Sequence, residues 1–127
     1  HVMGWNTTVV APPEGSMADY IASLETLMAR DCDSVFLPGH GERIDEPRRT
    51  VKAYLVHRKV REQAILKAIQ DGAQSIRALL PVIYPDLPLK LSPAAQLTLL
   101  AHVEWLAAKG LVSAAGPLTA DQLLEAV

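Results

Sequence analysis

The stretch between Pro47 and Gly72 contains no other proline and no glycine, and this predicts one long helix. Pro47 suits the first turn of such a helix, where no backbone N–H is needed. Apolar residues gather at its two ends, whereas the middle, from His57 to Gln63, is mostly polar. A helix with this pattern is expected to bridge two cores. The apolar residues are Val51, Tyr54 and Leu55 at one end and Ala64, Ile65, Ala68 and Ile69 at the other.

The first 45 residues predict a strand, a helix and a second strand. Thr7–Val10 is short and β-branched, and Ser34–Leu37 is a short apolar run that suits a buried strand. Between them, Ser16 is a candidate N-cap for a helix that continues to about residue 30. Its apolar residues recur at helical spacing and predict one buried face. They are Tyr20, Ile21, Leu24, Leu27 and Met28.

From Pro47 onward, the sequence predicts three helices, of which the long helix is the first, followed by a strand and a turn. Ser75 is expected to cap a helix that reaches Tyr84, and a stronger helix is expected from Ser92 to Lys109, where Gly110 ends it. A strand at Leu111–Ser113 and a last short helix capped by Thr119 follow. This is the order of a winged-helix domain, although a generic three-helix bundle has the same pattern. The predicted fold class is α+β and mostly helical.

Composition limits the classes of protein that fit. The 127 residues carry a formal net charge of −2, so a globally basic nucleic-acid binder is not expected. The single cysteine, Cys32, excludes an internal disulfide and a cysteine-rich zinc site. No apolar run approaches the roughly 20 residues that a membrane span needs, and the start has no secretory leader. We therefore expect a soluble, cytoplasmic protein with no membrane partner.

The segment Pro38-Gly39-His40-Gly41 is the sharpest local signal for chemistry. A histidine between two glycines, directly after an apolar strand, leaves its imidazole exposed at a sheet edge. Glycine also removes side chains that would crowd a ligand. The strand ends of α/β sheets are places where ligands and metal-binding groups converge. An incidental histidine in a tight turn is the alternative interpretation.

These residues resemble the last histidine motif of the metallo-β-lactamase superfamily. The segment 1–10 is similar to the sequence just after the metal-bridging aspartate of that superfamily. Tyr54–Arg58 and Arg61–Gln63 resemble one branch, the β-lactamase-like proteins with a C-terminal winged helix, which includes endoribonucleases and some thioesterases. The resemblance implies that residues 1–46 are an incomplete C-terminal part of the αβ/βα hydrolase domain. Residues 47–127 would then be a winged-helix-like domain.

The resemblance also implies a metal-dependent hydrolase as the intact parent protein. Such a parent would hold two zinc ions and cleave a phosphodiester, thioester or related bond with metal-activated water. Of its ligands only His40 is carried over, because the HxHxDH signature, a further histidine and the bridging aspartate have no counterpart in this sequence. Zinc sites need three or four protein ligands. The chain alone is therefore expected to be catalytically inactive, and the substrate of the parent to be a small molecule or RNA.

His57 and Arg58 allow two interpretations. They either belong to a solvated helix face, with Glu62 available to Arg58 four residues on, or line the edge of the active-site cleft of the parent. Seven basic residues fall on or beside this helix against three acidic ones, an excess that suits a phosphate backbone or an acidic cofactor arm. The basic residues are Arg48, Arg49, Lys52, Arg58, Lys59, Arg61 and Lys67, and the acidic ones are Asp45, Glu46 and Glu62.

The helix from Ser92 to Lys109 would be the recognition helix of a winged helix. The face that we assign to solvent is poor in positive charge, and the wing has no Lys or Arg, so duplex DNA is not an expected partner. A free-standing winged-helix module that binds protein or single-stranded nucleic acid remains the alternative function. Exposed strand edges and one face of the helix at 16–30 predict a homo-oligomer. The face assigned to solvent comprises Ala94, Ala95, Thr98, His102, Trp105 and Lys109.

Overall fold

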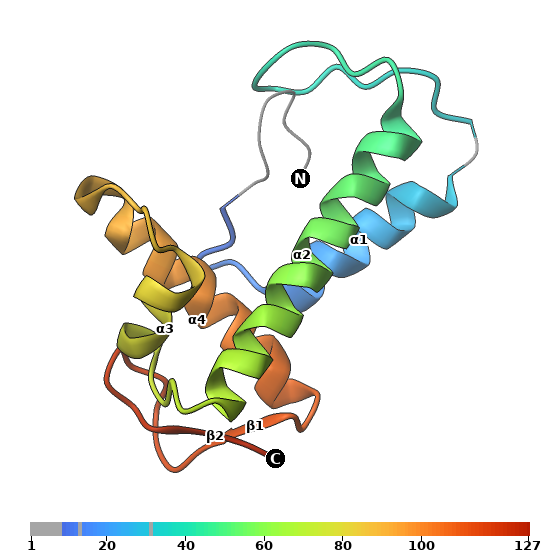
Figure 1. Cartoon of the computed structure of the whole chain (residues 1–127). Helices are drawn as coiled ribbons and strands as arrows, with labels where there is room; N and C mark the ends of the chain where they lie inside the picture. The colour runs from blue at the N-terminus through green and yellow to red at the C-terminus, as the bar shows by residue number, and fades with distance from the viewer. Residues whose placement is uncertain (1–8, 13, 31) are drawn as a thin grey trace.

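The structure is a computed structural model that describes residues 9–12, 14–30 and 32–127. In this part of the chain four α-helices and one short 3₁₀ helix are followed by a two-stranded sheet (Figure 1). The predicted fold class, mostly helical with a small β component, is confirmed. The elements are α1 (Met17–Ala29), α2 (Pro47–Gln70), α3 (Ile76–Ile83), η1 (Leu89–Leu91), α4 (Ser92–Ala108), β1 (Val112–Ala114) and β2 (Leu124–Ala126).

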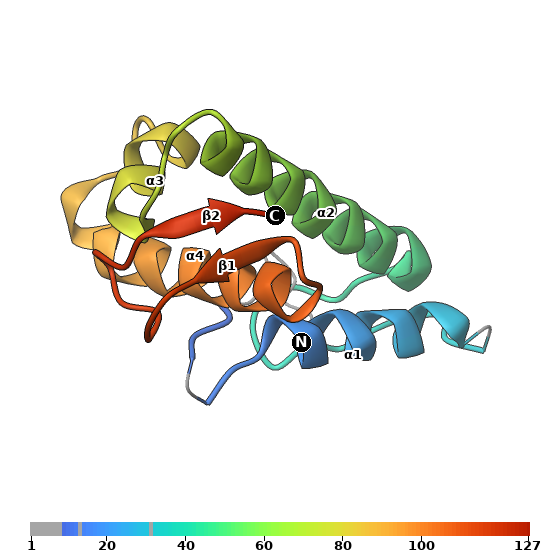
Figure 2. The same ribbon diagram turned by 90° about the horizontal axis from the view of Figure 1, so that it is seen from below.

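Helix α2 joins two separate hydrophobic cores, as its apolar ends predict. The C-terminal half of α2 packs with α3, α4 and the strands, and its N-terminal half lies beside α1 (Figure 2). The C-terminal core consists of Ile65, Ala68, Ile69, Ile76, Leu79, Leu99, Val103, Leu106, Val112 and Leu124. The N-terminal core consists of Val10, Met17, Tyr20, Leu24, Val51 and Ala101.

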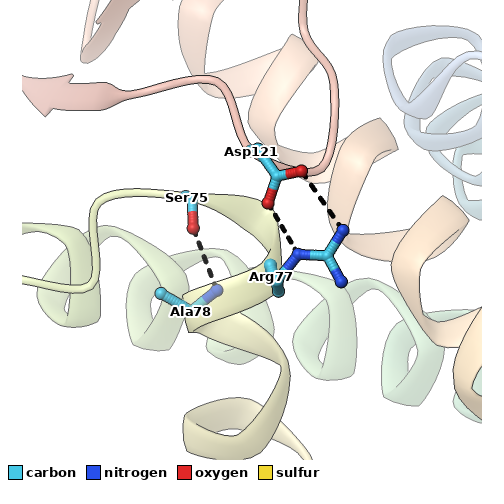
Figure 3. Close-up of polar contacts among 4 residues, drawn as sticks. All are labelled: Ser75, Arg77, Ala78 and Asp121. Carbon is cyan, nitrogen blue, oxygen red and sulfur yellow. Dashed lines mark hydrogen bonds and ion pairs between the residues drawn. The ribbon is translucent and has the colours of Figure 1, made fainter.

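The helix termini follow the signals in the sequence. Ser16 caps α1, because the backbone N–H of Asp19 donates to its hydroxyl over 3.4 Å. Ser75 caps α3 in the same way, with the N–H of Ala78 donating over 3.0 Å (Figure 3). Gly110 follows α4 with a φ of +75°, a left-handed conformation that only glycine adopts easily.

The two strands form an antiparallel ladder that is tied to α3. Val112 pairs with Ala126, and Ala114 pairs with Leu124. Arg77 at the start of α3 forms two bonds with the carboxylate of Asp121, which lies between the strands, at 2.6 and 3.2 Å (Figure 3). The backbone N–H of Arg77 also donates to the carbonyl of Ala120. The segment between β1 and β2 is therefore held against α3 by backbone and side-chain bonds together.

Three predicted elements differ from the structure. Ser34–Leu37 contributes only one β-bridge, between Phe36 and Ile44, because no other described segment lies alongside it to extend the ladder. The prediction of a last helix from Thr119 is wrong. The chain forms β2 instead, which begins at Leu124 and supplies the pairing that β1 needs. Thr7 and Thr8 of the first predicted strand lie outside the described residues, and Val9 and Val10 are not in a strand.

Two broader expectations complete the comparison. The division of the chain into domains at 1–46 and 47–127 stays a prediction. Helix α2 contributes side chains to both hydrophobic cores. Within the described ranges, none of the helices is both long enough and apolar enough to cross a bilayer.

Candidate functional site

His40 lies on an exposed loop between the two residues of the isolated β-bridge. The N–H groups of Phe36 and Ile44 each donate to the carbonyl of the other over 2.9 Å, which closes the loop at its base. Gly41 has a φ of +87°, so the turn beside His40 requires glycine. The loop therefore presents the imidazole to solvent, as the sequence indicates. Across residues 9–12, 14–30 and 32–127 no group of three metal-binding side chains gathers around it or elsewhere.

Arg58 is buried in the middle of α2, with only 4% of its surface exposed. Its guanidinium lies over the ring of Tyr20, 5.0 Å from the ring centroid, and so connects α2 to α1. The interpretation of Arg58 as part of a solvated face is therefore wrong. Glu62, expected to pair with Arg58, instead accepts a hydrogen bond from Lys109 of α4 at 2.5 Å. The Arg58 side chain therefore contacts the N-terminal core through Tyr20.

His57 precedes Arg58 but points to solvent. Desolvation is the largest cause that lowers the pKa of His57, followed by the positive charges of Arg61 and Arg58. No hydrogen bond or ion pair within the described chain joins His40 to His57 or Arg58. The structure thus places His57 and Arg58 together at the middle of α2, and His40 separately, in the loop that leads to this helix.

His102 is the residue of this region that the sequence analysis misplaces. The sequence predicts a surface position, yet only 1% of His102 is exposed, and neither ring nitrogen has a hydrogen-bond partner among the described residues. Burial, followed by the positive charge of Arg58, lowers its pKa to about 3. A signal is present, because His102 lies three residues after Leu99 and four before Leu106, within the same buried stripe. The other charges that lower this pKa are Arg61, His57 and Lys109.

Helix α4 is buried on two sides, which changes its expected role. Leu99, Val103 and Leu106 face the C-terminal core, whereas Ala101 belongs to the N-terminal core. The face assigned to solvent from the sequence is partly wrong, since Ala95 and His102 are buried. Trp105 is half-buried against the N-terminal core, as expected of a packing residue. A recognition helix in this position is largely covered by the rest of the chain.

The basic residues of α2 differ in their contacts, and two of them, Arg49 and Lys67, form ion pairs with exposed carboxylates. Arg58 and Arg61 serve packing: Arg61 lies 4.6 Å from the ring centroid of Tyr84 and donates to the carbonyl of Ile83 at 3.2 Å. Lys52 and Lys59 are exposed, and neither forms an ion pair with a described residue. They are seven residues apart and therefore lie on one face of the helix. This face is the electropositive part of α2 that remains open to a ligand.

Comparison with known proteins finds similar sequences that cover parts of this chain. The family model "Beta-lactamase associated winged helix domain" matches residues 75–117. A curated relative, the "Beta-lactamase-like protein 2 homolog" of Drosophila melanogaster, is 34% identical over 95 residues, which are 72% of this chain and 32% of the relative.

Solved structures show the same fold at lower identity. A metallo-β-lactamase family protein from Thermus thermophilus superposes with a TM-score of 0.70 and 24% identity, over 87% of this chain and 33% of its own. A β-lactamase domain protein from Burkholderia ambifaria gives a TM-score of 0.76 and 19% identity, with the same coverage of 87% and 33%. The chain thus spans about a third of the length of the relatives that it matches. Residues 75–117 thus match the β-lactamase-associated winged helix domain, and the part of the chain that these comparisons cover is similar to metallo-β-lactamase family proteins.

Proposed function

We propose that this chain is part of a metal-dependent hydrolase of the metallo-β-lactamase superfamily. The observation that carries the proposal is the 34% identity to the β-lactamase-like relative, which extends over 72% of this chain. The relative is about three times as long as the matched segment, so the hydrolase would be a protein of that size. Its reaction would be the cleavage of a phosphodiester, thioester or related bond.

The residues that the structure describes do not make a metal site by themselves. His40 is an exposed imidazole between two glycines, which suits a ligand, but a zinc site needs two or three more protein ligands close to it. No such cluster exists in the described residues. We therefore assign no catalytic step to this chain alone. In the longer hydrolase, His40 would contribute one nitrogen to a zinc site, and the remaining ligands would come from other segments.

The open basic face of α2 favours a substrate that carries phosphate. Lys52 and Lys59 are exposed and lack carboxylate partners among the described residues, so both ammonium groups are available to an anion. Arg48 is exposed one turn before Lys52 and continues the same face. Single-stranded RNA and phosphate-bearing small molecules both fit this chemistry. His57 and Arg58 would support the cleft from the middle of the helix, Arg58 by holding α1 against α2.

The test compares His40→Ala with Glu42→Ala in the protein of full length. Both residues are exposed on the same loop, and only His40 is proposed to bind metal. We expect His40→Ala to lose about half of the bound zinc, measured by mass spectrometry, and to lower hydrolysis of a phosphodiester substrate about 100-fold or more. Glu42→Ala should retain both. Full zinc content and activity in His40→Ala would refute the proposal.

A second candidate, a winged-helix interaction module, is favoured by the family match at residues 75–117. If this module binds nucleic acid, this 127-residue chain alone should bind single-stranded RNA, and the binding should depend on salt. The exposed residues of α4 include Leu97 and Glu104, which do not attract phosphate. A protein partner therefore suits this domain better than a nucleic acid. Tight RNA binding that weakens steeply with salt and survives substitution of Lys52 and Lys59 by alanine would favour the nucleic-acid module instead.

A further inference from the structure

A groove of about 340 Å³ lies where α1, α2 and α4 meet. These three helices pack against one another in pairs, and the lining residues Ile21, Leu55 and Trp105 all pack against the N-terminal core. Figure 2 shows α1, α2 and α4 side by side. The volume of the groove falls at the lower end of the range of small-ligand sites, about 300–1,000 Å³. The lining is mostly apolar, with Ile21 from α1, Leu55 and Val56 from α2 and Trp105 from α4. It has the size and the floor of a site for a small ligand with an apolar body.

One wall of the groove is fixed by an ion pair and an aromatic contact. The ammonium group of Lys109 lies 4.7 Å from the ring centroid of Trp105 and donates to the carboxylate of Glu62. Glu62 is only 17% exposed, and Lys109 is 35% exposed, so water screens this pair less than it screens a surface pair. The three side chains hold one another in place across α2 and α4. Their charges neutralise each other and leave the wall without net charge.

Two opposite charges remain at the groove without ion-pair partners in the described chain. Lys59 comes from α2 and Glu25 from α1, so they approach the apolar floor from different helices. Both are exposed, and neither forms an ion pair with a described residue, including each other. A ligand that satisfies both must carry a negative and a positive group within the span of this one groove. Its remaining part must be apolar, to cover Leu55, Val56 and the Trp105 ring.

We propose that this groove binds a free apolar α-amino acid. The carboxylate of the amino acid would pair with Lys59, its ammonium group with Glu25, and its side chain would lie against the apolar floor. An amino acid is the smallest common metabolite class that combines both charges with an apolar body. The proposal does not depend on the hydrolase activity, although it shares Lys59 with the basic face that the proposed function assigns to an anionic substrate.

The first test is a calorimetric titration of the chain at pH 7 with leucine, with phenylalanine and with two derivatives of leucine. N-acetyl-leucine lacks the ammonium group and leucinamide lacks the carboxylate, so each removes one proposed ion pair and keeps the apolar side chain. We expect saturable binding of leucine, with a Kd about tenfold lower than that of either derivative. Absence of saturable binding by leucine and by phenylalanine would overturn the proposal. Equal affinity for leucine and both derivatives would also overturn it.

The second test locates the binding in the groove with matched variants. Lys59→Ala and Glu25→Ala should each raise the Kd of leucine about tenfold, whereas Lys67→Ala should leave it unchanged. Lys67 is an exposed lysine of the same helix that is paired with Asp71 and does not line the groove. All three substitutions are at exposed positions and leave both cores intact. Equal affinities in Lys59→Ala and Lys67→Ala would contradict the assignment.

Discussion

Acidification should destabilise this protein through His102. The side chain is 1% exposed, and its pKa is lowered from 6.5 to about 3 by burial and by the positive charges around it. The imidazole of His102 therefore binds a proton near pH 6.5 in the unfolded chain, but only near pH 3 in the folded chain. Stability from the neutral imidazole is complete above pH 6.5 and is lost progressively as the pH falls toward 3.

The size of the effect follows from the two pKa values. At pH 5 the unfolded imidazole is protonated and the folded one is neutral, so the free energy of unfolding is about 2 kcal/mol lower than at pH 7.5. Carboxylates with ordinary pKa values stay largely ionised over this range. The pKa of His57 is lowered as well. The contribution of His102 must therefore be measured as a difference between proteins.

The assay is urea unfolding followed by circular dichroism at pH 7.5, 6.5, 5.5 and 5. We expect His102→Phe, which keeps a ring and removes the titration, to lose about 2 kcal/mol less than the natural chain between pH 7.5 and 5. His57→Ala serves as the control, because it removes a more exposed histidine of the same region and should keep most of the pH dependence. Equal losses in His102→Phe and the natural chain would refute the reasoning.

Four further outcomes are expected. Leu99→Ala should lower the free energy of unfolding by about 2–5 kcal/mol in urea titrations, because Leu99 is fully buried in the C-terminal core. Ser75→Ala should lower it by about 1 kcal/mol, through loss of the bond from Ala78, and Ser75→Asp should not. Arg58→Ala should make fluorescence and circular dichroism report different unfolding midpoints, since Arg58 connects α2 to Tyr20; coincident midpoints would contradict this. Light scattering should show a homo-oligomer, because Leu37 is 80% exposed and Leu89 is 89% exposed, and a monomer at high concentration would argue against it.

Helices and caps can be predicted from the sequence because their signals are local. Ser16 and Ser75 bond to backbone groups only three residues away, and the glycine after α4 adopts its conformation within one turn. The pattern of α2 even indicates two cores, since its apolar ends lie about 20 Å apart along the axis. The position of His40 on an exposed, glycine-flanked loop can be predicted for the same reason.

Features that depend on distant segments cannot be predicted in this way. Among the described residues, the β-bridge of Phe36 with Ile44 is isolated, so the apolar run around Phe36 is not a strand, and periodicity does not reveal how many strands will pair with it. The burial of Arg58 depends on Tyr20, which approaches from another helix. A charged residue in the middle of a polar stretch carries no local sign of such a neighbour. The groove at α1, α2 and α4 is invisible to the sequence for the same reason.

The position of α4 explains why the positive charge of this chain lies on α2. In a winged-helix domain that reads DNA, the third helix of the domain, which corresponds to α4 here, is exposed so that it can enter a groove of the DNA. Here that helix carries Val103 to one core and Ala101 to the other, so its surface already serves to hold the two cores together. A basic residue on its buried faces would lack partners, as His102 illustrates, since neither of its ring nitrogens has a hydrogen-bond partner among the described residues. We therefore propose that an anionic substrate meets the chain along Lys52 and Lys59 of α2, both of which are exposed.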